Sequence, residues 1–221
     1  MPHGEAITTR AAPTADASGA GYFRILFVCT GNVCRSVIAE RLARREILAR
    51  LGEEAGRFRV ASAGTATRDR APMHPYTVQA LSWLGADTEG FRSRQLTACD
   101  IDQADLILSA GQEHRDQVLA IRPSASRRTY LLREFARLAA VISPTAAACG
   151  AAQQARDVVA AAARLRGRVP YVDPAADEIS DPAADSQAFL GCAQVIDGSV
   201  RVVLDALCGS FSAGPTTGPS R

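Results

Sequence analysis

Residues 23–36 read FRILFVCTGNVCRS, and they carry the clearest structural pattern in the chain. The segment from Phe23 to Val28 is almost continuously apolar, which is typical of a strand buried on both faces of a parallel sheet. The glycine-containing segment from Cys29 to Arg35 predicts a short loop. Between Ser36 and about Leu51, apolar residues recur every four positions among charged ones, which predicts an amphipathic helix. The chain therefore begins as a strand, a tight loop and a helix.

The same alternation continues along the chain. Strands are expected at 58–62, 105–109 and 128–131, and helices near 75–84, 112–121 and 132–141. Apolar residues step by four and three from Phe189 to Leu207, so we expect a final helix that covers the sheet. Strands that alternate with helices predict an α/β fold with a parallel sheet.

Residues 143–170 differ in composition, because they are rich in Ala and Arg and poor in large apolar side chains. Ala has the highest helix propensity, so Ala151–Leu165 could form a helix, although it has little to anchor it to a core. We interpret 143–170 as a surface insertion or a lid. The remaining chain predicts one folded domain at 22–208 between flexible tails at 1–21 and 209–221.

The overall composition excludes several classes of protein. Of the 221 residues, 47% are apolar and 22% are charged, which suits a folded globular chain. Net charge is only +2, so we expect neither a nucleic acid nor a membrane partner. The sequence contains no Lys, which excludes a lysine Schiff base or a lysine general base. It also has neither a long apolar span nor an apolar leader, so we expect no membrane helix and no secretory signal.

The cysteine pattern bears on metal binding and on the compartment. Six cysteines occur without any C-x-x-C pair or Cys/His ladder, which argues against a zinc site, and we expect no metal and no cofactor. Cysteines in a chain of this length without an export signal favour a reducing cytoplasm.

The loop after the first strand carries the strongest chemical signal. Cys29 and Arg35 lie six positions apart on a loop that leads into a helix, where backbone N–H groups and the helix N-terminus can hold an anion. Gly31 and Asn32 tolerate the left-handed backbone that such a loop needs. The planar fork of Arg35 can grip two phosphate oxygens, and such a site favours the thiolate of Cys29, a nucleophile aimed at phosphorus. The alternative is a buried structural Cys and a surface Arg on an ordinary turn.

The stretch VCTGNVCRS resembles the signature V-C-x-G-N-x-C-R-S of low molecular weight protein tyrosine phosphatases. The resemblance extends to the stretches Ala63–Thr65, Arg94–Thr97 and Ala104–Leu108, and it covers roughly Phe23 to Phe135 and Ile179 to Leu207. It implies a four-stranded parallel sheet flanked by helices, of Rossmann-like type, which agrees with the four expected strands. The Ala/Arg-rich insertion and the tails lie outside it.

The resemblance also implies roles for residues of the loop. Cys29 would attack phosphorus and form a phosphocysteine, and Arg35 would bind the phosphate. Ser36 would donate a hydrogen bond to the Cys29 thiolate, while Asn32 would hold the loop in shape with Ser62 as its partner. The phosphate site would comprise Thr30, Gly31, Asn32, Val33, Cys34, Arg35 and Ser36. The second cysteine of the signature, Cys34, would form a reversible disulfide with the nucleophile, or it fills space as a small apolar residue.

One carboxyl group can protonate the leaving oxygen and then activate water. The family places this group in an Asp-Pro pair before the last helix, and two pairs occur here, Asp173-Pro174 and Asp181-Pro182. We favour Asp181, because residues 177–182 resemble the D-x-x-D-P approach of the family. The alternative is that either pair is only a turn signal.

The sequence departs from the family where a phenyl ring would be gripped. Ala183 and Ala184 follow the second Asp-Pro pair in place of aromatic residues, and the loop at 66–70 also lacks a ring. Tyr76 and Trp83 are expected in a helical core. These losses favour a small phosphorylated metabolite, such as a phosphosugar or a nucleoside-like biosynthetic intermediate, over phosphotyrosine. The additional residues that could meet an anionic substrate, or lie scattered on the surface, are Arg68, Arg70, Arg156 and Arg164. The insertion could cap the site or supply Tyr171 as an aromatic contact.

Two other functions remain as alternatives. A thioredoxin-coupled arsenate reductase shares the loop, but it needs two further cysteines near the strand at 105–109, and only Cys99 lies near it. A phosphate-binding module without catalysis would be expected if the nucleophile or the acid were missing. The favoured interpretation is a metal-independent phosphomonoesterase that is a monomer or a weak dimer, with inorganic phosphate as product and inhibitor.

Overall fold

The computed structural model describes residues 21–68, 70–142, 150–168, 172–183 and 185–209. The tails expected at 1–21 and 209–221 lie outside these ranges except for Gly21 and Gly209. Within the described residues, no helix combines the length and hydropathy needed to cross a bilayer. The same residues contain no group of three or more His, Cys, Asp or Glu side chains able to hold a metal ion.

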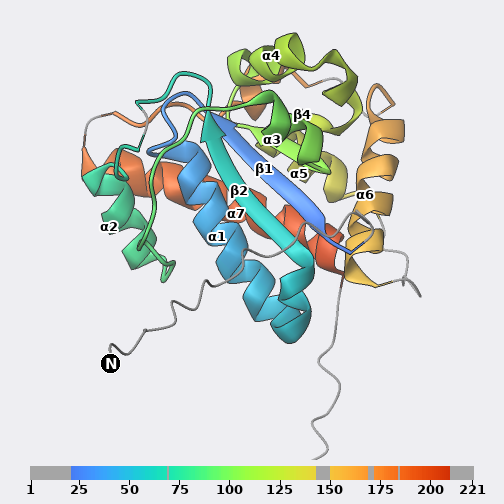
Figure 1. Ribbon diagram of the computed structural model, residues 1–221, viewed down its shortest axis with the longest axis horizontal. Helices are drawn as coiled ribbons and strands as arrows, with labels where there is room; N and C mark the ends of the chain where they lie inside the picture. The colour runs from blue at the N-terminus through green and yellow to red at the C-terminus, as the bar shows by residue number, and fades with distance from the viewer. Residues whose placement is uncertain (1–20, 69, 143–149, 169–171, 184, 210–221) are drawn as a thin grey trace, which may run out of the picture.

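Four strands form one parallel sheet in the order β2-β1-β3-β4 (Figure 1), as the sequence predicts. The strands are β1 (Phe23–Cys29), β2 (Phe58–Gly64), β3 (Leu106–Ser109) and β4 (Thr129–Leu131). The chain leaves β1 toward β2 on one side and later returns to β3 on the other side. The loops after β1 and β3 therefore diverge at the carboxyl edge of the sheet, where open α/β sheets bind ligands.

Seven α-helices and three short 3-10 helices connect and flank the strands in the described chain. The helices are α1 (Arg35–Leu51), α2 (Pro75–Trp83), α3 (Ala98–Gln103), α4 (Gln112–Ile121), α5 (Leu132–Ala139), α6 (Ala151–Leu165) and α7 (Ser186–Cys208). The 3-10 helices span Gly52–Arg57, Pro123–Arg128 and Pro174–Asp177. The sequence pattern missed α3 and the 3-10 helices, because segments of four to six residues are too short to show a hydrophobic period.

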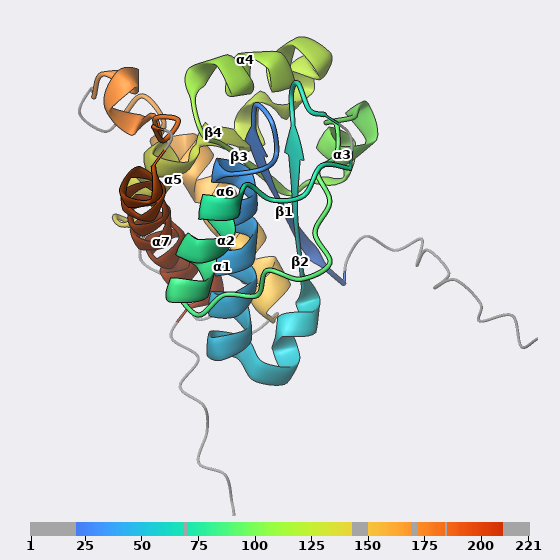
Figure 2. The same ribbon diagram turned by 90° about the vertical axis from the view of Figure 1, so that its left-hand side faces the viewer.

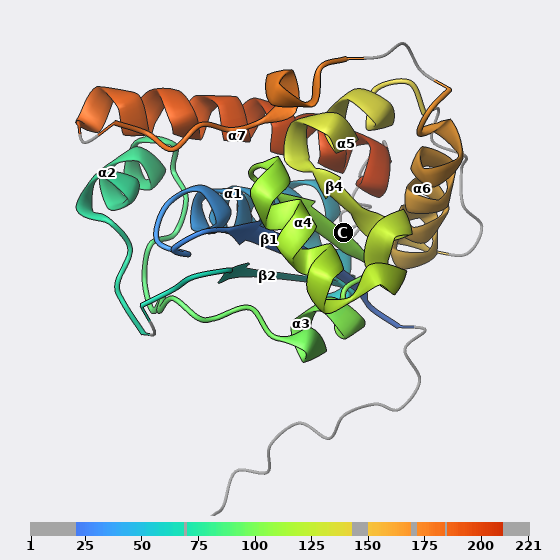
Figure 3. The same ribbon diagram turned by 90° about the horizontal axis from the view of Figure 1, so that it is seen from above.

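Helices cover both faces of the sheet (Figures 2 and 3). Ile25 and Phe27 of β1 pack into the larger core with α1, α2, α5, α6 and α7, whereas Leu26 and Val28 pack into a smaller core with α3 and α4. Side chains alternate between the two faces of a strand. This explains why β1 reads as a continuous apolar run rather than an alternating one.

We interpret 143–170 as a surface insertion or a lid, and from this segment the structure describes α6, a helix with one buried face. Ala151, Ala155 and Ala162 of α6 are almost completely buried, and the helix packs with α5 and α7 as part of the larger core. Arg156 of α6 bonds the carbonyl of Tyr22, before β1, so α6 lies by the amino ends of the strands and away from the phosphate loop (Figure 1). Small side chains allow close helix contact, which replaces the large apolar residues that α6 lacks. Residues 143–149 and 169–171 are outside the described chain.

Candidate active site

The loop between β1 and α1 forms a cradle of backbone N–H groups. Three of its carbonyl oxygens accept hydrogen bonds from neighbouring loops, which turns the N–H side of the loop inward. The acceptors are the carbonyls of Cys29, Thr30 and Val33, and the donors are the N–H groups of Thr65, Ala66 and His74, at 2.9, 3.0 and 3.0 Å. Within the described chain, no N–H group from Gly31 to Arg35 donates a hydrogen bond. Backbone N–H groups without a partner beside a helix N-terminus are an arrangement that can hold an anion.

A chain of buried polar side chains runs from the core to the sulfur of Cys29. Asn32 donates its amide protons to Ser36 Oγ at 3.0 Å and to Ser62 Oγ at 2.8 Å. Because Ser36 accepts from Asn32, its own proton is available to Cys29 Sγ, 2.9 Å away. Ser62 donates in turn to Glu40 Oε2 at 2.5 Å. A hydroxyl donor directed at the sulfur stabilises a thiolate there. Glu40, which belongs to none of the motifs identified in the sequence, orients the Ser36 hydroxyl indirectly, through Ser62 and Asn32.

Arg35 connects the loop to the segment before α7. Its side chain is buried, and it donates to Thr30 Oγ1 at 3.3 Å and to the carbonyl of Ile179 at 3.1 Å. The Nε atom of Arg35 lies 3.1 Å from Oδ1 of Asp181, whose own side chain is 73% exposed. Two residues that are far apart in sequence thus meet at the mouth of the cradle.

The position of this segment is fixed by contacts with β3, α4 and α5. The buried Asp177 forms an ion pair of 2.6 Å with Arg137, and the Ile179 N–H donates to the carbonyl of Ala110 at 2.8 Å. Glu178 accepts a hydrogen bond from the Gln112 N–H at 3.2 Å. These contacts hold the chain just before Asp181, so the carboxylate has a defined place over the loop.

The other Asp-Pro pair serves a local purpose. The carboxylate of Asp173 accepts a hydrogen bond of 3.0 Å from the Ala175 N–H and caps the 3-10 helix at Pro174–Asp177. Only Asp181 of the two lies beside Arg35. The geometry therefore favours Asp181 as the candidate acid and gives Asp173 the role of a turn residue.

The structure adds His114 to the site, a residue that belongs to none of the motifs identified in the sequence. His114 is buried at the start of α4, and its Nε2 atom lies 2.8 Å from Thr30 Oγ1. Burial, and then the positive charge of Arg35, lower the pKa of His114. The lowered pKa favours the neutral form of His114, and its ring braces the loop through Thr30. Its proximity could not be predicted from sequence, because it depends on the pairing of β1 with β3.

A cavity of about 370 Å³ opens beside the loop, between Thr30, Arg35 and the start of α4. Three carboxylates line it, those of Glu113, Glu178 and Asp181. Carboxylates accept hydrogen bonds from hydroxyl groups and pair with cations, but they offer nothing to a flat apolar ring. The mouth of the candidate site is therefore acidic on this side.

Cys34 does not pair with the nucleophile in this structure, and both are free thiols. The neighbour of Cys34 is Cys192 of α7, whose hydrogen bond, together with burial, raises the pKa of the Cys34 thiol. The disulfide between Cys29 and Cys34 remains a prediction, and Cys192 is a third thiol at the same site that the resemblance does not include.

The rings nearest the loop pack against one another. His74 stacks on Phe189 with ring centroids 4.5 Å apart, and Tyr76 meets Phe189 edge-on at 5.6 Å. Phe189 is 5% exposed, so this cluster joins α2 to α7. Trp83 was expected in a core, but it is 67% exposed at the end of α2, so that prediction is wrong. Ala184 and Tyr171 lie outside the described residues.

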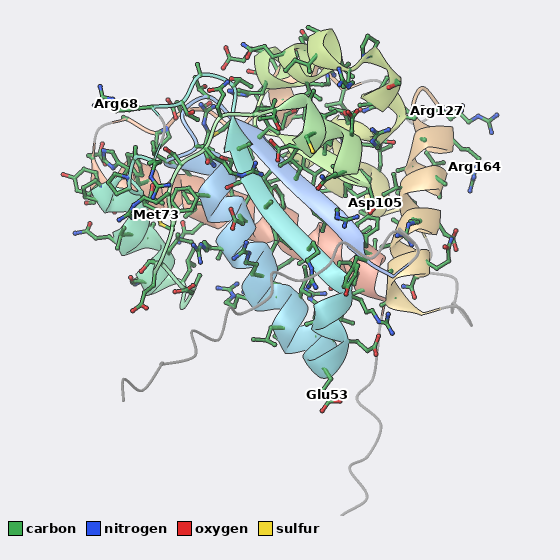
Figure 4. The ribbon with its side chains drawn as sticks, viewed as in Figure 1. Glu53, Arg68, Met73, Asp105, Arg127 and Arg164 are labelled. Carbon is green, nitrogen blue, oxygen red and sulfur yellow. The ribbon has the colours of Figure 1, made fainter. Side chains whose placement is uncertain are left out.

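The four arginines that could meet an anionic substrate separate into two groups. Arg68 lies in the loop after β2, on the side of α2, whereas Arg164 lies on α6 at the opposite side (Figure 4). Arg156 is also on α6, where it pairs with Asp105, the residue just before β3. The proposal that Arg156 and Arg164 meet a substrate at the loop is therefore wrong, because α6 packs at the other edge of the sheet.

Known proteins are similar to this chain in sequence and in fold. The pattern of the family "Low molecular weight phosphotyrosine protein phosphatase" matches residues 24–141. Over 111 residues the chain is 36% identical to the low molecular weight protein-tyrosine-phosphatase Etp of Escherichia coli strain K12, which covers 50% of this chain and 70% of Etp. Over 113 residues it is 34% identical to a protein-arginine-phosphatase of Geobacillus stearothermophilus, which covers 51% and 71% of the two chains. The structure of Vibrio vulnificus Wzb in complex with benzylphosphonate superposes with a TM-score of 0.55 and 25% identity over 82% of this chain and 96% of that one.

The fold and the loop define a cysteine-dependent phosphatase, an enzyme that hydrolyses phosphoester bonds. More narrowly, the chain belongs to the low molecular weight phosphotyrosine protein phosphatase family. The family match ends at residue 141, so α6 and the segment carrying Asp181 lie beyond it.

Proposed function

We propose that this enzyme hydrolyses phosphate monoesters through a phosphocysteine on Cys29. The observation that carries the proposal is the contact between the Ser36 hydroxyl and Cys29 Sγ at the base of the N–H cradle. Ser36 accepts a hydrogen bond from Asn32, so its own proton can be donated to the sulfur 2.9 Å away. The thiolate attacks phosphorus, an S–P bond forms, and the P–O bond to the leaving group breaks. Arg35 and the backbone N–H groups stabilise the charge on the three equatorial oxygens.

The two steps of the reaction together need a group that first gives and then takes a proton. Asp181 gives its proton to the leaving oxygen in the first step and takes a proton from water in the second. That water attacks phosphorus, the S–P bond breaks, and inorganic phosphate leaves with Cys29 again a thiolate. The support for this assignment is the 3.1 Å approach of Asp181 to Arg35, together with the local use of Asp173.

The phosphocysteine can be trapped. Acid quenching during turnover of p-nitrophenyl phosphate, followed by peptide mass spectrometry, should find a phosphoryl group on the peptide that carries Cys29. Cys29→Ser should abolish turnover and Cys34→Ser should leave the adduct in place, which separates the two cysteines of the loop. Normal turnover by Cys29→Ser would exclude the mechanism.

For the substrate, we favour a small phosphorylated metabolite with several hydroxyl groups, such as a phosphosugar. The support is the acidic wall of Glu113, Glu178 and Asp181, which can accept hydrogen bonds from hydroxyl groups. The packing of His74, Tyr76 and Phe189 against one another also leaves these rings poorly placed to grip a phenyl group.

A second candidate substrate is phosphoarginine in proteins. The same acidic wall would pair with a guanidinium leaving group, and one relative is named as a protein-arginine-phosphatase. In this case the bond that breaks is P–N, and Asp181 would protonate nitrogen.

A panel distinguishes these substrates. Phosphate release without added metal should be compared for sugar phosphates, nucleoside monophosphates, phosphotyrosine peptides and phosphoarginine peptides, with Cys29→Ser as the blank. A kcat/KM for one sugar phosphate well above the values for both peptide classes supports a metabolite substrate. A kcat/KM for phosphotyrosine or phosphoarginine peptides well above that for every sugar phosphate rejects it. Inorganic phosphate should inhibit competitively.

The free thiols in the described chain also support a reducing compartment such as the cytoplasm.

A further inference from the structure

A second and larger cavity lies where α6 meets the amino ends of the strands. Its volume is about 610 Å³, within the range of small-molecule sites. Asp105 precedes β3, and Arg128 ends the 3-10 helix before β4, so this cavity is at the amino edge of the sheet. The lining residues are Asp105, Ser124, Arg127, Arg128, Arg156, Val159, Ala160, Ala163 and Arg164.

The cavity and the phosphate loop are at opposite edges of the sheet. The seven residues of β1 separate Tyr22, which α6 contacts, from the loop that begins at Cys29. At roughly 3.3 Å per residue this is about 20 Å. A ligand in this cavity cannot touch Cys29, so the cavity is not part of the phosphatase site.

The cavity carries an excess of positive charge. Asp105 is its one acidic lining residue, and its carboxylate is already engaged by the Arg24 N–H at 2.8 Å and by Arg156 at 3.3 Å. Arg156 also bonds the carbonyl of Tyr22, so this arginine fastens α6 to the sheet. The remaining cations are therefore not neutralised by the single carboxylate.

Three arginines from two elements keep donors for a ligand. Arg128 uses one terminal nitrogen on the carbonyl of Ile101 at 3.3 Å, and its buried Nε has no partner among the described residues. The exposed side chains of Arg127 and Arg164 form no hydrogen bond or ion pair with the described chain. Figure 4 shows both beside α6 on the same side of the molecule, with Asp105 further inward. Guanidinium groups hold phosphate oxygens in pairs, so three of them suit more than one phosphate group.

The wall that α6 contributes to the cavity carries an apolar strip, Val159, Ala160 and Ala163, between two arginines. Arg156, Val159, Ala160, Ala163 and Arg164 follow helical spacing and share one face of α6. The two alanines have small side chains, which leaves open space between α6 and the 3-10 helix. A planar apolar group can lie against this wall while its phosphates reach the arginines.

We propose that this cavity binds a small ligand that carries two or more phosphate charges and a planar apolar group, the chemistry of a nucleoside diphosphate. Phosphate groups account for the three arginines, and the ring accounts for the apolar strip on α6. The assignment concerns binding at a site separate from the phosphatase chemistry.

Calorimetric titration of the full chain with inorganic diphosphate, ADP and adenosine tests the proposal. We expect ADP to bind more tightly than inorganic diphosphate, and adenosine to bind weakly. Arg127→Gln combined with Arg164→Gln should raise the Kd for ADP by about tenfold or more. Ala160→Glu should do the same by placing a negative charge in the cavity, and Ala160→Gln, which adds the same bulk without charge, should weaken binding less. Ala160 is exposed on a helix, so both variants should fold.

Two controls separate binding in this cavity from a general effect of charge and from binding at the phosphate loop. Arg57→Gln combined with Arg201→Gln removes the same charge from exposed positions elsewhere and should leave the Kd unchanged. Binding at the phosphate loop is scored separately as competitive inhibition of p-nitrophenyl phosphate hydrolysis, which the cavity variants should not alter. An ADP affinity that is equal in all variants, or reduced equally by the control pair, overturns the proposal. Equal affinities for ADP and inorganic diphosphate overturn the part of the proposal that places the planar apolar group of the ligand against α6. Because calorimetry needs no turnover, these outcomes do not depend on the proposed phosphatase activity.

Discussion

Replacing Asn32, the only asparagine in the chain, should damage both stability and catalysis. Asn32 is completely buried and makes three hydrogen bonds: it donates to Ser36 and Ser62, and its Oδ1 accepts from the Arg94 N–H at 2.9 Å. Its φ of 52° lies in the left-handed region, which Asn tolerates better than Ala does.

The magnitude follows from these features. Three hydrogen bonds at about 0.5–1.5 kcal/mol each, plus about 1 kcal/mol for Ala at positive φ, predict that Asn32→Ala lowers the free energy of unfolding by about 2.5–5.5 kcal/mol. Asn32→Gly loses the same hydrogen bonds without the backbone strain, so it should be about 1 kcal/mol more stable than Asn32→Ala. In both variants Ser36 is no longer oriented toward Cys29, and kcat/KM should fall by about 10²-fold.

Urea unfolding gives the first quantity, and p-nitrophenyl phosphate hydrolysis gives the second. The Gly variant is the matched control, because it separates the lost amide from the backbone conformation. A loss of stability below about 1 kcal/mol in Asn32→Ala, or equal stability of the Ala and Gly variants, would refute this account of the loop. Unchanged kcat/KM in a folded Asn32→Gly would refute the role of Asn32 in orienting Ser36.

Three further changes have defined outcomes. Asp181→Asn should slow turnover by roughly 10²–10⁴-fold, most for poor leaving groups, while Asp173→Asn should change it little; the reverse order in steady-state kinetics contradicts the assignment of the acid. Because burial and Arg35 lower the pKa of His114, the unfolded chain binds a proton more readily, so stability is lost as pH falls below about 6.5. His114→Gln should therefore lose less stability than the wild type between pH 7 and pH 5, and equal slopes in urea unfolding would exclude this effect. Gly64→Ala should destabilise the protein and lower its thermal midpoint, because a methyl group there overlaps the carbonyl of Thr30; an unchanged midpoint would mean that the loop can move aside.

Much of the fold was predictable because its signals are local. The apolar run of β1, the four-residue period of α1 and the alternation of later strands and helices each need only neighbouring residues. The loop motif is local too, since Cys29 and Arg35 lie on one turn between a strand and a helix. Short elements such as α3 could not be predicted, because six residues form less than two helical turns and show no hydrophobic period.

The parallel sheet, the strand–loop–helix and the candidate nucleophile with its arginine can be predicted from the amino-acid sequence. Four features depend on the three-dimensional packing: which carboxylate lies beside Arg35, the contact of His114 with Thr30, the contact of Cys192 with Cys34, and the position of α6 at the far edge of the sheet. Hydrophobic period and turn chemistry act over a few residues, so they appear in the sequence as patterns. The pairing of Arg35 with a residue 146 positions later depends on how β1, β3 and α7 pack together, and no local pattern records that packing.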